Sequence, residues 1–537
     1  MDMNTFDKIK STMKIRSLFL ILSILISQII SAQSVRIGAS TSLQKDKTIE
    51  LLDAMFAKAI IDFNVPGMSI AIIKDDKVLL SKGYGEKTAG TKQKVDDKSL
   101  FAIASNSKAF TAAALAILVD EGKIKWEDKV RTHLPYFQLY SPYVTEEFTI
   151  RDLLSHRSGL ATFSGDLIWY GTTHSREEVI KRAKFLKPIY GFRETYGYSN
   201  IMFLAAGEIV TKVSGQSWDD FIRDRFFKPL GMITSNTTIR DFKKDGNIAS
   251  PHNEVNGKNV AIDYINWDNI GAAGSINSSV SDLIQWMRLQ LGKGTLGEKK
   301  YWNEARTHEM WENVTPKPVG KWQRENMPTR HFNGYGLGWD LMEYGGYKIV
   351  SHGGGYDGMI SKTVLVPELN LGFVILTNSN NSLPSCLTFE ILDEFLGIKN
   401  QQDWLKTFLG FKTDGEKESK AAEEKAEAAR NKDSKPSLPL TSYVGTYTSE
   451  MYGDVIVGLG RESNLTIDFV PTALFKGNLN HWQYDTFQLS WTTQMMLPKG
   501  IATFVLNAEG NPEELRVVVD NPDFDFTELR LMKKAAK

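Results

Sequence analysis

A charged run between positions 412 and 439 most constrains how this chain can fold. From 416 to 432 nearly every residue is Lys, Glu, Ala or Arg, and no apolar stripe repeats at helical spacing. The run therefore predicts a solvated helix or a flexible spacer rather than part of a hydrophobic core. We expect residues 411–436 to be a linker between a large domain and a small one.

The large part, residues 33–410, has strand-like segments at both ends and helix-like segments between them. This order predicts one α/β domain whose sheet collects strands from both ends. The expected strands lie at 69–73, 78–81, 347–351, 360–366 and 372–377. The expected helices lie at 107–120, 178–183, 201–213, 218–227, 280–291 and 389–396.

The small part, residues 437–537, has a different pattern of short segments in which apolar and polar residues alternate. Asn, Gly and Asp turns separate these segments at regular spacing, which is typical of a small antiparallel barrel or sandwich. The clearest expected strands lie at 454–457, 465–469, 503–506 and 515–519.

Charge balance and cysteine content exclude several classes of function. Among 537 residues, 64 are basic and 64 acidic, so the formal net charge is zero and nothing indicates nucleic-acid binding. The single cysteine, Cys386, excludes an intrachain disulfide and a Cys-rich metal site, and we expect it to be a buried apolar residue. No histidine pair has H-E-x-x-H or another paired metal spacing, so no metal site is indicated. We expect no organic cofactor either.

Residues 1–32 have the pattern of a secretory signal peptide. Basic residues precede the apolar run 18–30, which ends at Ser31-Ala32-Gln33. The apolar run is shorter than the roughly 20 residues that span a bilayer. We therefore expect cleavage after Ala32 and a secreted, periplasmic protein without a stable membrane span. An uncleaved anchor is the alternative, and Met13 is a second candidate start.

The first candidate catalytic motif is S-x-x-K, in Ser105-Asn106-Ser107-Lys108. Ser105 follows an apolar run and opens an Ala-rich helix, which places Lys108 one turn later on the same face. A serine hydroxyl needs a neighbour that accepts its proton, and a partly desolvated lysine can do so because burial lowers its pKa. The alternative is a helix-capping serine with Lys108 on a solvated surface.

Tyr198-Ser199-Asn200 stands just before the expected helix at 201–213. A phenol can relay a proton between a serine and a leaving group, and an asparagine can bind both a lysine and a substrate carbonyl. The alternative is a helix-capping asparagine beside a core aromatic residue.

The third candidate motif is the Gly-rich segment His352-Gly353-Gly354-Gly355, at the end of an expected strand. Glycines let a substrate backbone lie close to a strand edge, where a backbone N–H can face a developing oxyanion. A plain Gly-rich hairpin is the alternative. The glycine spacing also fits a dinucleotide fingerprint, which we reject because a strand-like segment follows where that fingerprint needs a helix.

The order S-x-x-K, Y-x-N and Gly-rich motif resembles the serine β-lactamase and penicillin-binding-protein superfamily, in particular its class C β-lactamase-like serine hydrolases. The resemblance covers about residues 49–396, and the tail resembles the lipocalin-like domain often appended to such hydrolases. It implies an α/β sandwich of β-lactamase/transpeptidase type, with an antiparallel sheet flanked by helices, a helical subdomain and a C-terminal all-β barrel.

The resemblance also implies the catalytic roles. Ser105 would be the acylated nucleophile and Lys108 its base. Tyr198 would protonate the leaving group and activate the deacylating water. His156 would be a structural turn residue rather than part of a Ser-His triad, and no G-x-S-x-G elbow occurs in the chain.

The remaining implied roles concern substrate. Asn200, His352 and Gly354 would position it, and the backbone N–H groups of Ser105 and Gly355 would form the oxyanion hole. Where β-lactamases carry Lys-Thr-Gly or a close variant, this chain has His352 followed by two glycines. It thus lacks a fixed cation and a hydroxyl that would bind a substrate carboxylate, since an imidazole is mostly neutral near pH 7.

The sequence therefore predicts a secreted serine hydrolase that forms an acyl-enzyme with a small-molecule or peptide substrate. The expected substrates are esters, amides or peptides, including peptides with D-residues. Three alternatives stay open: a class C-type β-lactamase, a non-catalytic penicillin- or peptidoglycan-binding protein, and an interaction protein built around the barrel.

Overall fold

The computed structural model describes residues 47–327, 329–398, 402–461, 464–493 and 497–535. The predicted signal peptide lies outside these residues. The chain divides into two compact units, residues 1–58 and 59–537, and within the first of them residues 47–58 are helical. Among the residues described, no helix is both long and apolar enough to cross a membrane.

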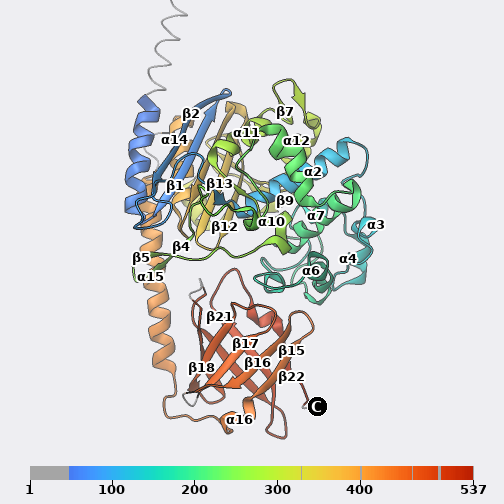
Figure 1. Cartoon of the computed structure of the whole chain (residues 1–537), viewed down its shortest axis with the longest axis vertical. Helices are drawn as coiled ribbons and strands as arrows, with labels where there is room; N and C mark the ends of the chain where they lie inside the picture. Colours follow the sequence, from blue (N-terminus) through green and yellow to red (C-terminus); the bar gives the residue numbers. More distant parts are fainter. Residues whose placement is uncertain (1–46, 328, 399–401, 462–463, 494–496, 536–537) are drawn as a thin grey trace, which may run out of the picture. The chain divides into compact units, whose positions relative to one another are not determined.

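The large domain of the second unit is built on one eight-stranded antiparallel sheet (Figure 1). β1 lies between β2 and β14, so that Ile70 pairs with Ile375 and the two ends of the domain meet in the sheet. This confirms the predicted α/β fold with an antiparallel sheet. In sheet order, the strands are β2 (Lys77–Gly85), β1 (Gly67–Lys74), β14 (Leu371–Thr377), β13 (Met359–Val366), β12 (Tyr347–Tyr356), β11 (Asp340–Tyr344), β10 (Asn333–Tyr335) and β9 (Thr315–Lys317).

Helices cover this sheet because its central strands are apolar on both faces. Every residue of β14 is buried, as is every residue of β1 before Lys74. α11 (Val280–Leu291) packs on β1 and β14, and α14 (Leu383–Leu396) packs on β13. Cys386 lies on α14 and is buried, as the sequence predicted.

α2 (Ser107–Asp120) is the central helix of the helical subdomain. All of its residues from Ser107 to Leu118 are buried. Its alanines let α7 (Asn200–Ser214) and the short α10 (Gly271–Gly274) pack against it. At Gly207 of α7, an added Cβ would lie only 2.3 Å from the Cβ of Ala272 on α10. The distance between these helices is therefore set by small side chains.

The remaining elements of the large domain are short. Three two-stranded sheets pair β3 (Phe101–Ala102) with β6 (Asn277–Ser278), β4 (His252–Val255) with β5 (Lys258–Ala261), and β7 (Thr295–Leu296) with β8 (Lys299–Lys300). The expected helix at 218–227 is α8 (Trp218–Ile222) followed by a π-helical turn, Arg223–Phe227. The other α-helices are α3 (Val130–His133), α4 (Pro142–Glu147), α5 (Ile150–Leu153), α6 (Arg176–Arg182), α9 (Lys228–Leu230), α12 (Glu304–Met310) and α13 (Lys321–Asn326).

The charged run belongs to a long helix, α15 (Trp404–Ala429), of 26 residues. Its first residue is buried, and the Trp404 ring stacks on Phe389 of α14 with 4.6 Å between ring centroids. Every residue from 410 to 426 is exposed. Of the two alternatives that the sequence left open, the structure shows the solvated helix.

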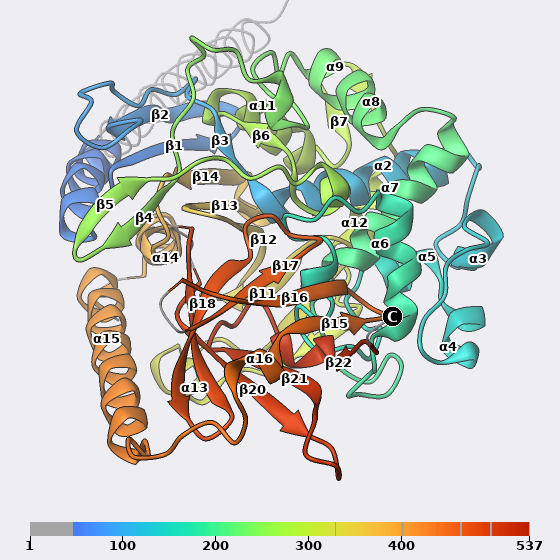
Figure 2. The ribbon, with the colours of Figure 1, turned by 60° about the horizontal axis from the view of Figure 1, so that its bottom comes forward.

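The C-terminal domain is a closed eight-stranded barrel, with strands drawn in orange and red in Figure 2. The sequence predicted four of its strands, β16 (Gly453–Leu459), β17 (Leu465–Phe469), β20 (Gly500–Leu506) and β21 (Pro512–Val519). The other four contain fewer β-branched residues or are short, so their alternation gave a weaker signal. They are β15 (Gly445–Ser449), β18 (Lys476–Gln483), β19 (Thr486–Trp491) and β22 (Leu531–Lys533).

Two glycine-to-alanine substitutions in helices should differ in their effect on stability. Gly207→Ala forces a Cβ against Ala272, so we expect the free energy of unfolding to fall by about 1–3 kcal/mol. Gly410→Ala in α15 meets no atom within 4 Å and should be neutral, or stabilising by at most about 1 kcal/mol through helix propensity. Urea denaturation followed by circular dichroism measures both. Equal effects of the two changes would contradict the close helix contact.

Candidate active site

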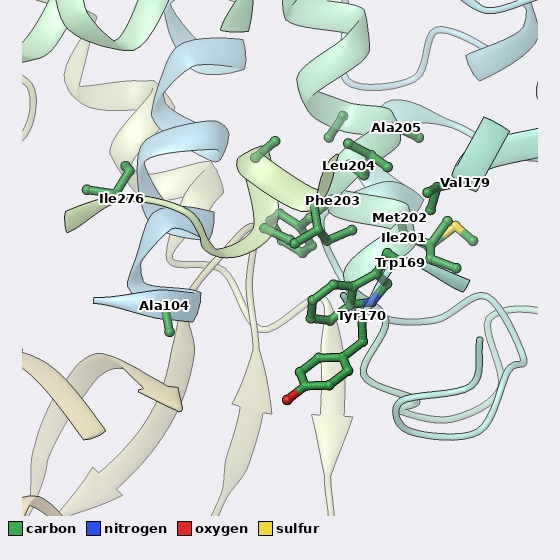
Figure 3. Packing of buried hydrophobic residues seen from close by; sticks show 14 of the residues in the cluster. Ala104, Trp169, Tyr170, Val179, Ile201, Met202, Phe203, Leu204, Ala205 and Ile276 are labelled. Carbon is green, nitrogen blue, oxygen red and sulfur yellow. The ribbon is translucent and has the colours of Figure 1, made fainter. Parts of the chain in front are cut away.

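Ser105 lies in a tight turn at the start of α2. The turn is a 3-10 helix, η1 (Ala104–Asn106), in which Ala104 and Asn106 are buried while Ser105 is partly exposed. Ala104 has a φ of 44°, in the left-handed region that is costly for a residue with a Cβ. Buried side chains near this turn, including Ala104 itself and Phe203 of α7, are drawn in Figure 3. The turn thus presents the Ser105 side chain while its neighbours hold the backbone in place.

Lys108 is buried beside Ser105 and donates to three oxygen acceptors. Its Nζ lies 3.0 Å from Ser105 Oγ, 2.7 Å from Asn200 Oδ1 and 2.9 Å from the carbonyl oxygen of Ala273. It also lies 4.7 Å from the centre of the Tyr198 ring. The structure therefore brings the first two candidate motifs together around one ammonium group, and it does not place Lys108 on a solvated surface.

Burial sets the protonation of Lys108. Removal from water lowers the pKa of Lys108 well below its usual 10.5, and the negative charge of Asp166 opposes this shift only in part. A lowered pKa increases the neutral fraction of Lys108 at any given pH. Lys108 is therefore able to accept the proton of the Ser105 hydroxyl 3.0 Å away.

Tyr198 contacts both the nucleophile and Lys108. Its side chain hydrogen-bonds with that of Ser105, and burial raises the pKa of the Tyr198 phenol, so the phenol keeps its proton at neutral pH. The ring lies 4.2 Å from the His156 ring, whose Nδ1 accepts from the backbone N–H of Ser199 at 3.0 Å. His156 has a φ of 54° and is buried, and burial lowers its pKa well below 6.5. It supports the Tyr198 loop as a neutral residue.

Asp166 completes the support of Lys108, although no sequence motif pointed to it. Asn200 Nδ2 donates to Asp166 Oδ2 at 2.6 Å, and Trp169 Nε1 donates to Asp166 Oδ1 at 2.8 Å. Burial raises the pKa of Asp166 to about 7, although these hydrogen bonds and the charge of Lys108 oppose the shift. Asn200 thus connects an ammonium and a carboxyl group that both titrate far from their usual ranges.

The loop that carries Asp166 is also bound by a residue of the barrel. Glu528, in η8 (Phe526–Leu529), accepts from the backbone N–H of Gly165 at 2.8 Å and from the hydroxyl of Ser164. No local pattern in the sequence distinguishes Asp166 or Glu528, because their partners are separated from them by 34 and 363 residues of chain.

The Gly-rich motif lies in β12, directly against the turn that carries Ser105. Ser361 of β13 donates from its hydroxyl to the carbonyl of Ile103 at 2.7 Å and accepts from Asn106 Nδ2 at 2.8 Å. A Cβ on Gly354 would lie 2.1 Å from the Ile103 carbonyl oxygen and 3.0 Å from the Ser105 nitrogen. Only glycine fits there. Gly355 is the next residue of the strand and is exposed.

His352 is buried and both of its ring nitrogens have partners within the protein. Nε2 accepts from the Tyr335 hydroxyl at 2.9 Å, and Nδ1 donates to the carbonyl of Gly353 at 2.6 Å. Burial lowers the pKa of His352 to about 4, so the imidazole is neutral at physiological pH. The site therefore has no fixed cation at the position where β-lactamases carry lysine.

The described residues contain no group of three or more His, Cys, Asp or Glu side chains arranged to hold a metal ion. The chemistry that this site can perform with its own side chains is nucleophilic attack by Ser105, assisted by Lys108, whose lowered pKa favours proton acceptance, and by a protonated phenol.

Models of known protein families match two parts of the chain. A family model described as Beta-lactamase matches residues 52–388. The chain belongs to the beta-lactamase family. A second model, described as a domain of unknown function (DUF3471), matches residues 429–533 and so covers the barrel. The resemblance inferred from the three motifs is confirmed, and the chain is a serine hydrolase of the β-lactamase and penicillin-binding-protein type.

Two relatives illustrate the similarity in sequence. The chain is 27% identical over 427 residues to an unguisins hydrolase of Aspergillus campestris, which covers 75% of this chain and 76% of that protein. It is 29% identical over 327 residues to protein flp of Staphylococcus aureus, which covers 59% of this chain and 60% of that protein.

Solved structures with low sequence identity share the fold. The octameric penicillin-binding protein homologue from Pyrococcus abyssi is 22% identical, with a TM-score of 0.58 over 90% of this chain and 100% of that one. A D-stereospecific amidohydrolase from Streptomyces is 22% identical, with a TM-score of 0.51 over 64% of this chain and 97% of that one.

Neighbouring glycines of β12 should differ sharply in their tolerance of a side chain. Gly354→Ala must push β12 away from η1, and a displacement of about 1 Å typically costs about 100-fold in rate. Gly353→Ala is the matched control, because its nearest neighbour would be Lys362 Cδ at 3.8 Å, an ordinary contact. The rate at which a fluorophosphonate labels Ser105 measures both. Equal rates in the two variants would contradict the tight packing of β12 on the turn.

Proposed function

We propose that this chain hydrolyses ester, amide or peptide bonds through an acyl-enzyme on Ser105. The observation that carries the proposal is the 3.0 Å hydrogen bond between Ser105 Oγ and the buried Nζ of Lys108. A surface lysine would be charged and unable to accept a proton, whereas burial lowers the pKa of Lys108.

Acylation begins with attack of Ser105 Oγ on the substrate carbonyl carbon while its proton passes to neutral Lys108. The carbonyl oxygen becomes an oxyanion, which the backbone N–H groups of Ser105 and Gly355 are proposed to bind. Tyr198 retains its proton because burial raises its pKa, and it is hydrogen-bonded to Ser105. It therefore donates a proton to the leaving group as the tetrahedral intermediate collapses, and Lys108 replaces that proton.

Deacylation reverses these roles. Water attacks the acyl carbonyl from the position that the leaving group vacated, and its proton passes through Tyr198 toward neutral Lys108. The bond between the acyl carbon and Ser105 Oγ then breaks, the acid product leaves, and the proton on Lys108 returns to Ser105 Oγ. The phenol alone is a poor base at neutral pH, since its pKa is raised. The two residues act as one relay, which is why both are needed in the same buried site. Asn200 holds Lys108 in place and is proposed to orient the substrate.

The substrate class follows from the third motif. A neutral, internally hydrogen-bonded His352 does not supply a cation for a substrate carboxylate, which disfavours rapid β-lactam hydrolysis. The names of an unguisins hydrolase and a D-stereospecific amidohydrolase among the similar proteins support amide substrates, including those with D-residues. We propose that the reaction takes place outside the cytoplasm, on the pattern of residues 1–32.

Active-site labelling tests the nucleophile. A fluorophosphonate or a fluorescent penicillin should label the wild-type chain at Ser105 and leave Ser105→Ala unlabelled. Ser107→Ala is the matched control in the same motif, because the Ser107 hydroxyl accepts from the backbone N–H of Ile276 and not from Lys108. Labelling of Ser105→Ala at the wild-type rate would overturn the assignment. A substrate panel of acyl esters, D- and L-aminoacyl amides and lactams then identifies the hydrolase class, with slow lactam turnover expected.

The pH dependence tests the base. Because the pKa of Lys108 is lowered, the neutral form grows as pH rises through that lowered value, so the acylation rate should rise and level off well below pH 10.5. Lys108→Arg keeps a positive charge that does not dissociate. It should lose on the order of 100- to 10000-fold in acylation rate and show no such rise. A rise that persists in Lys108→Arg would assign the base to another group.

A further inference from the structure

A cavity of about 350 Å3 lies in the large domain, and Ser105, Lys108 and Tyr198 do not line it. Strand side chains alternate between the two faces of a sheet, so Ser351 and His352 of β12 point to opposite faces. Ser351 lines this cavity together with Thr388 of α14. The cavity therefore lies between the sheet and α14.

The cavity is strongly basic. Its charged lining residues are three cations, Lys317, Arg330 and Lys362, and one carboxylate, Asp340. We call these four residues the basic pocket. All four side chains are half-buried, and their formal charges leave an excess of two positive charges in a small concave space.

Two of the three cations have no carboxylate partner. Lys317 Nζ lies 2.7 Å from Asp340 Oδ1. Lys362 Nζ donates to the Ser351 hydroxyl at 3.2 Å, and Arg330 Nε donates to Asn333 Oδ1 at 2.7 Å. Over the ranges of chain that the structure describes, neither Lys362 nor Arg330 forms an ion pair. Arg330 Nη1 also contacts the weak acceptor Met327 Sδ at 3.4 Å, and the other N–H groups of Lys362 and Arg330 are available to a bound acceptor.

The two cations without a carboxylate partner are costly to the folded protein. Burial lowers the pKa of Lys362 and of Arg330, and each is lowered despite the opposing charge of Asp340. The positive charges of Lys317 and Arg330 also repel the ammonium of Lys362 and lower its pKa further. An uncompensated charge that is partly removed from water destabilises the folded state, and a bound anion would reverse this effect.

The lining defines the size and chemistry of such an anion. A guanidinium presents paired N–H groups that match the oxygens of a phosphate, and an ammonium adds a second charge. Neutral polar groups of Ser385 and Thr388 stand beside them, while Phe389 and Leu341 form an apolar wall. A volume of about 350 Å3 admits a small ligand and excludes a polymer.

We propose that the basic pocket binds a small dianion, either free phosphate or the phosphate group of a small organic ester, through Lys362 and Arg330. This site is separate from the nucleophile, and the inference does not rest on the proposed hydrolase activity. Lys317 is already paired with Asp340 and shapes the pocket rather than supplying its free charge.

Calorimetric titration of the full chain with inorganic phosphate, at constant ionic strength, tests the proposal. We expect saturable binding with one site per chain and a thermal midpoint that rises with phosphate concentration. Lys362→Met and Arg330→Gln should each weaken phosphate at least tenfold. Phenyl phosphate as a second probe distinguishes the sources, since tighter binding than phosphate indicates an ester with an apolar group against Phe389. Absence of saturable binding of either probe, or unchanged affinity in both variants, would overturn the proposal.

Two control variants separate specific binding from general effects. Lys321→Met removes a cation of α13 whose side chain is 83% exposed and which does not line the pocket, so phosphate affinity should be unchanged. Ser105→Ala should bind phosphate like the wild type, because the nucleophile is not part of the pocket. The thermal midpoint without phosphate shows whether Lys362→Met and Arg330→Gln are folded. A loss of affinity in Lys321→Met equal to that in Lys362→Met would mean nonspecific attraction and would overturn the proposal.

Discussion

The buried ammonium of Lys108 is the group on which the rest of this active site depends. Burying a lone ammonium costs several kcal/mol of folding free energy. A direct carboxylate partner would offset this cost, but it would also restore the high pKa of the lysine and make it a poor proton acceptor at neutral pH. The structure gives Lys108 three neutral oxygens and keeps Asp166 one side chain further away, beyond Asn200. The charge is thereby solvated by the protein, yet its proton remains exchangeable.

This arrangement requires helices that approach one another unusually closely. The three acceptors of Lys108 come from η1, α7 and the α10 segment, while Lys108 itself lies on α2. Alanines along α2 and the glycine at Gly207 permit the contacts. The chemistry at Ser105 is therefore inseparable from the packing of small residues behind it, and substitutions far from the substrate can act on the nucleophile through helix spacing.

The sequence predicted what local pattern encodes. α2 and α11 have the predicted limits because each is a long apolar-periodic run, and Ser105, Lys108, Tyr198 and Asn200 were found because their motifs are compact. Asp166 was missed because 34 residues of chain separate it from its partner Asn200. Likewise, Ser361 meets Asn106 across 255 residues. Half of the barrel strands were missed because apolar and polar residues alternate less regularly in them or because they are short. The hydrogen bond between His352 and Tyr335 was missed because no local sequence pattern relates these two residues.

The pairing of β1 with β14 also has a consequence for how the protein is made. β1 is one of the first strands to leave the ribosome, yet its neighbour on one side is β14. Ile70 can therefore pair with Ile375 only after β14 has been synthesised. The large domain thus has high contact order, and its central sheet cannot close until most of the chain has been synthesised. The turn that carries Ser105 likewise takes its contacts from Ser361, so the nucleophile is assembled only late in synthesis.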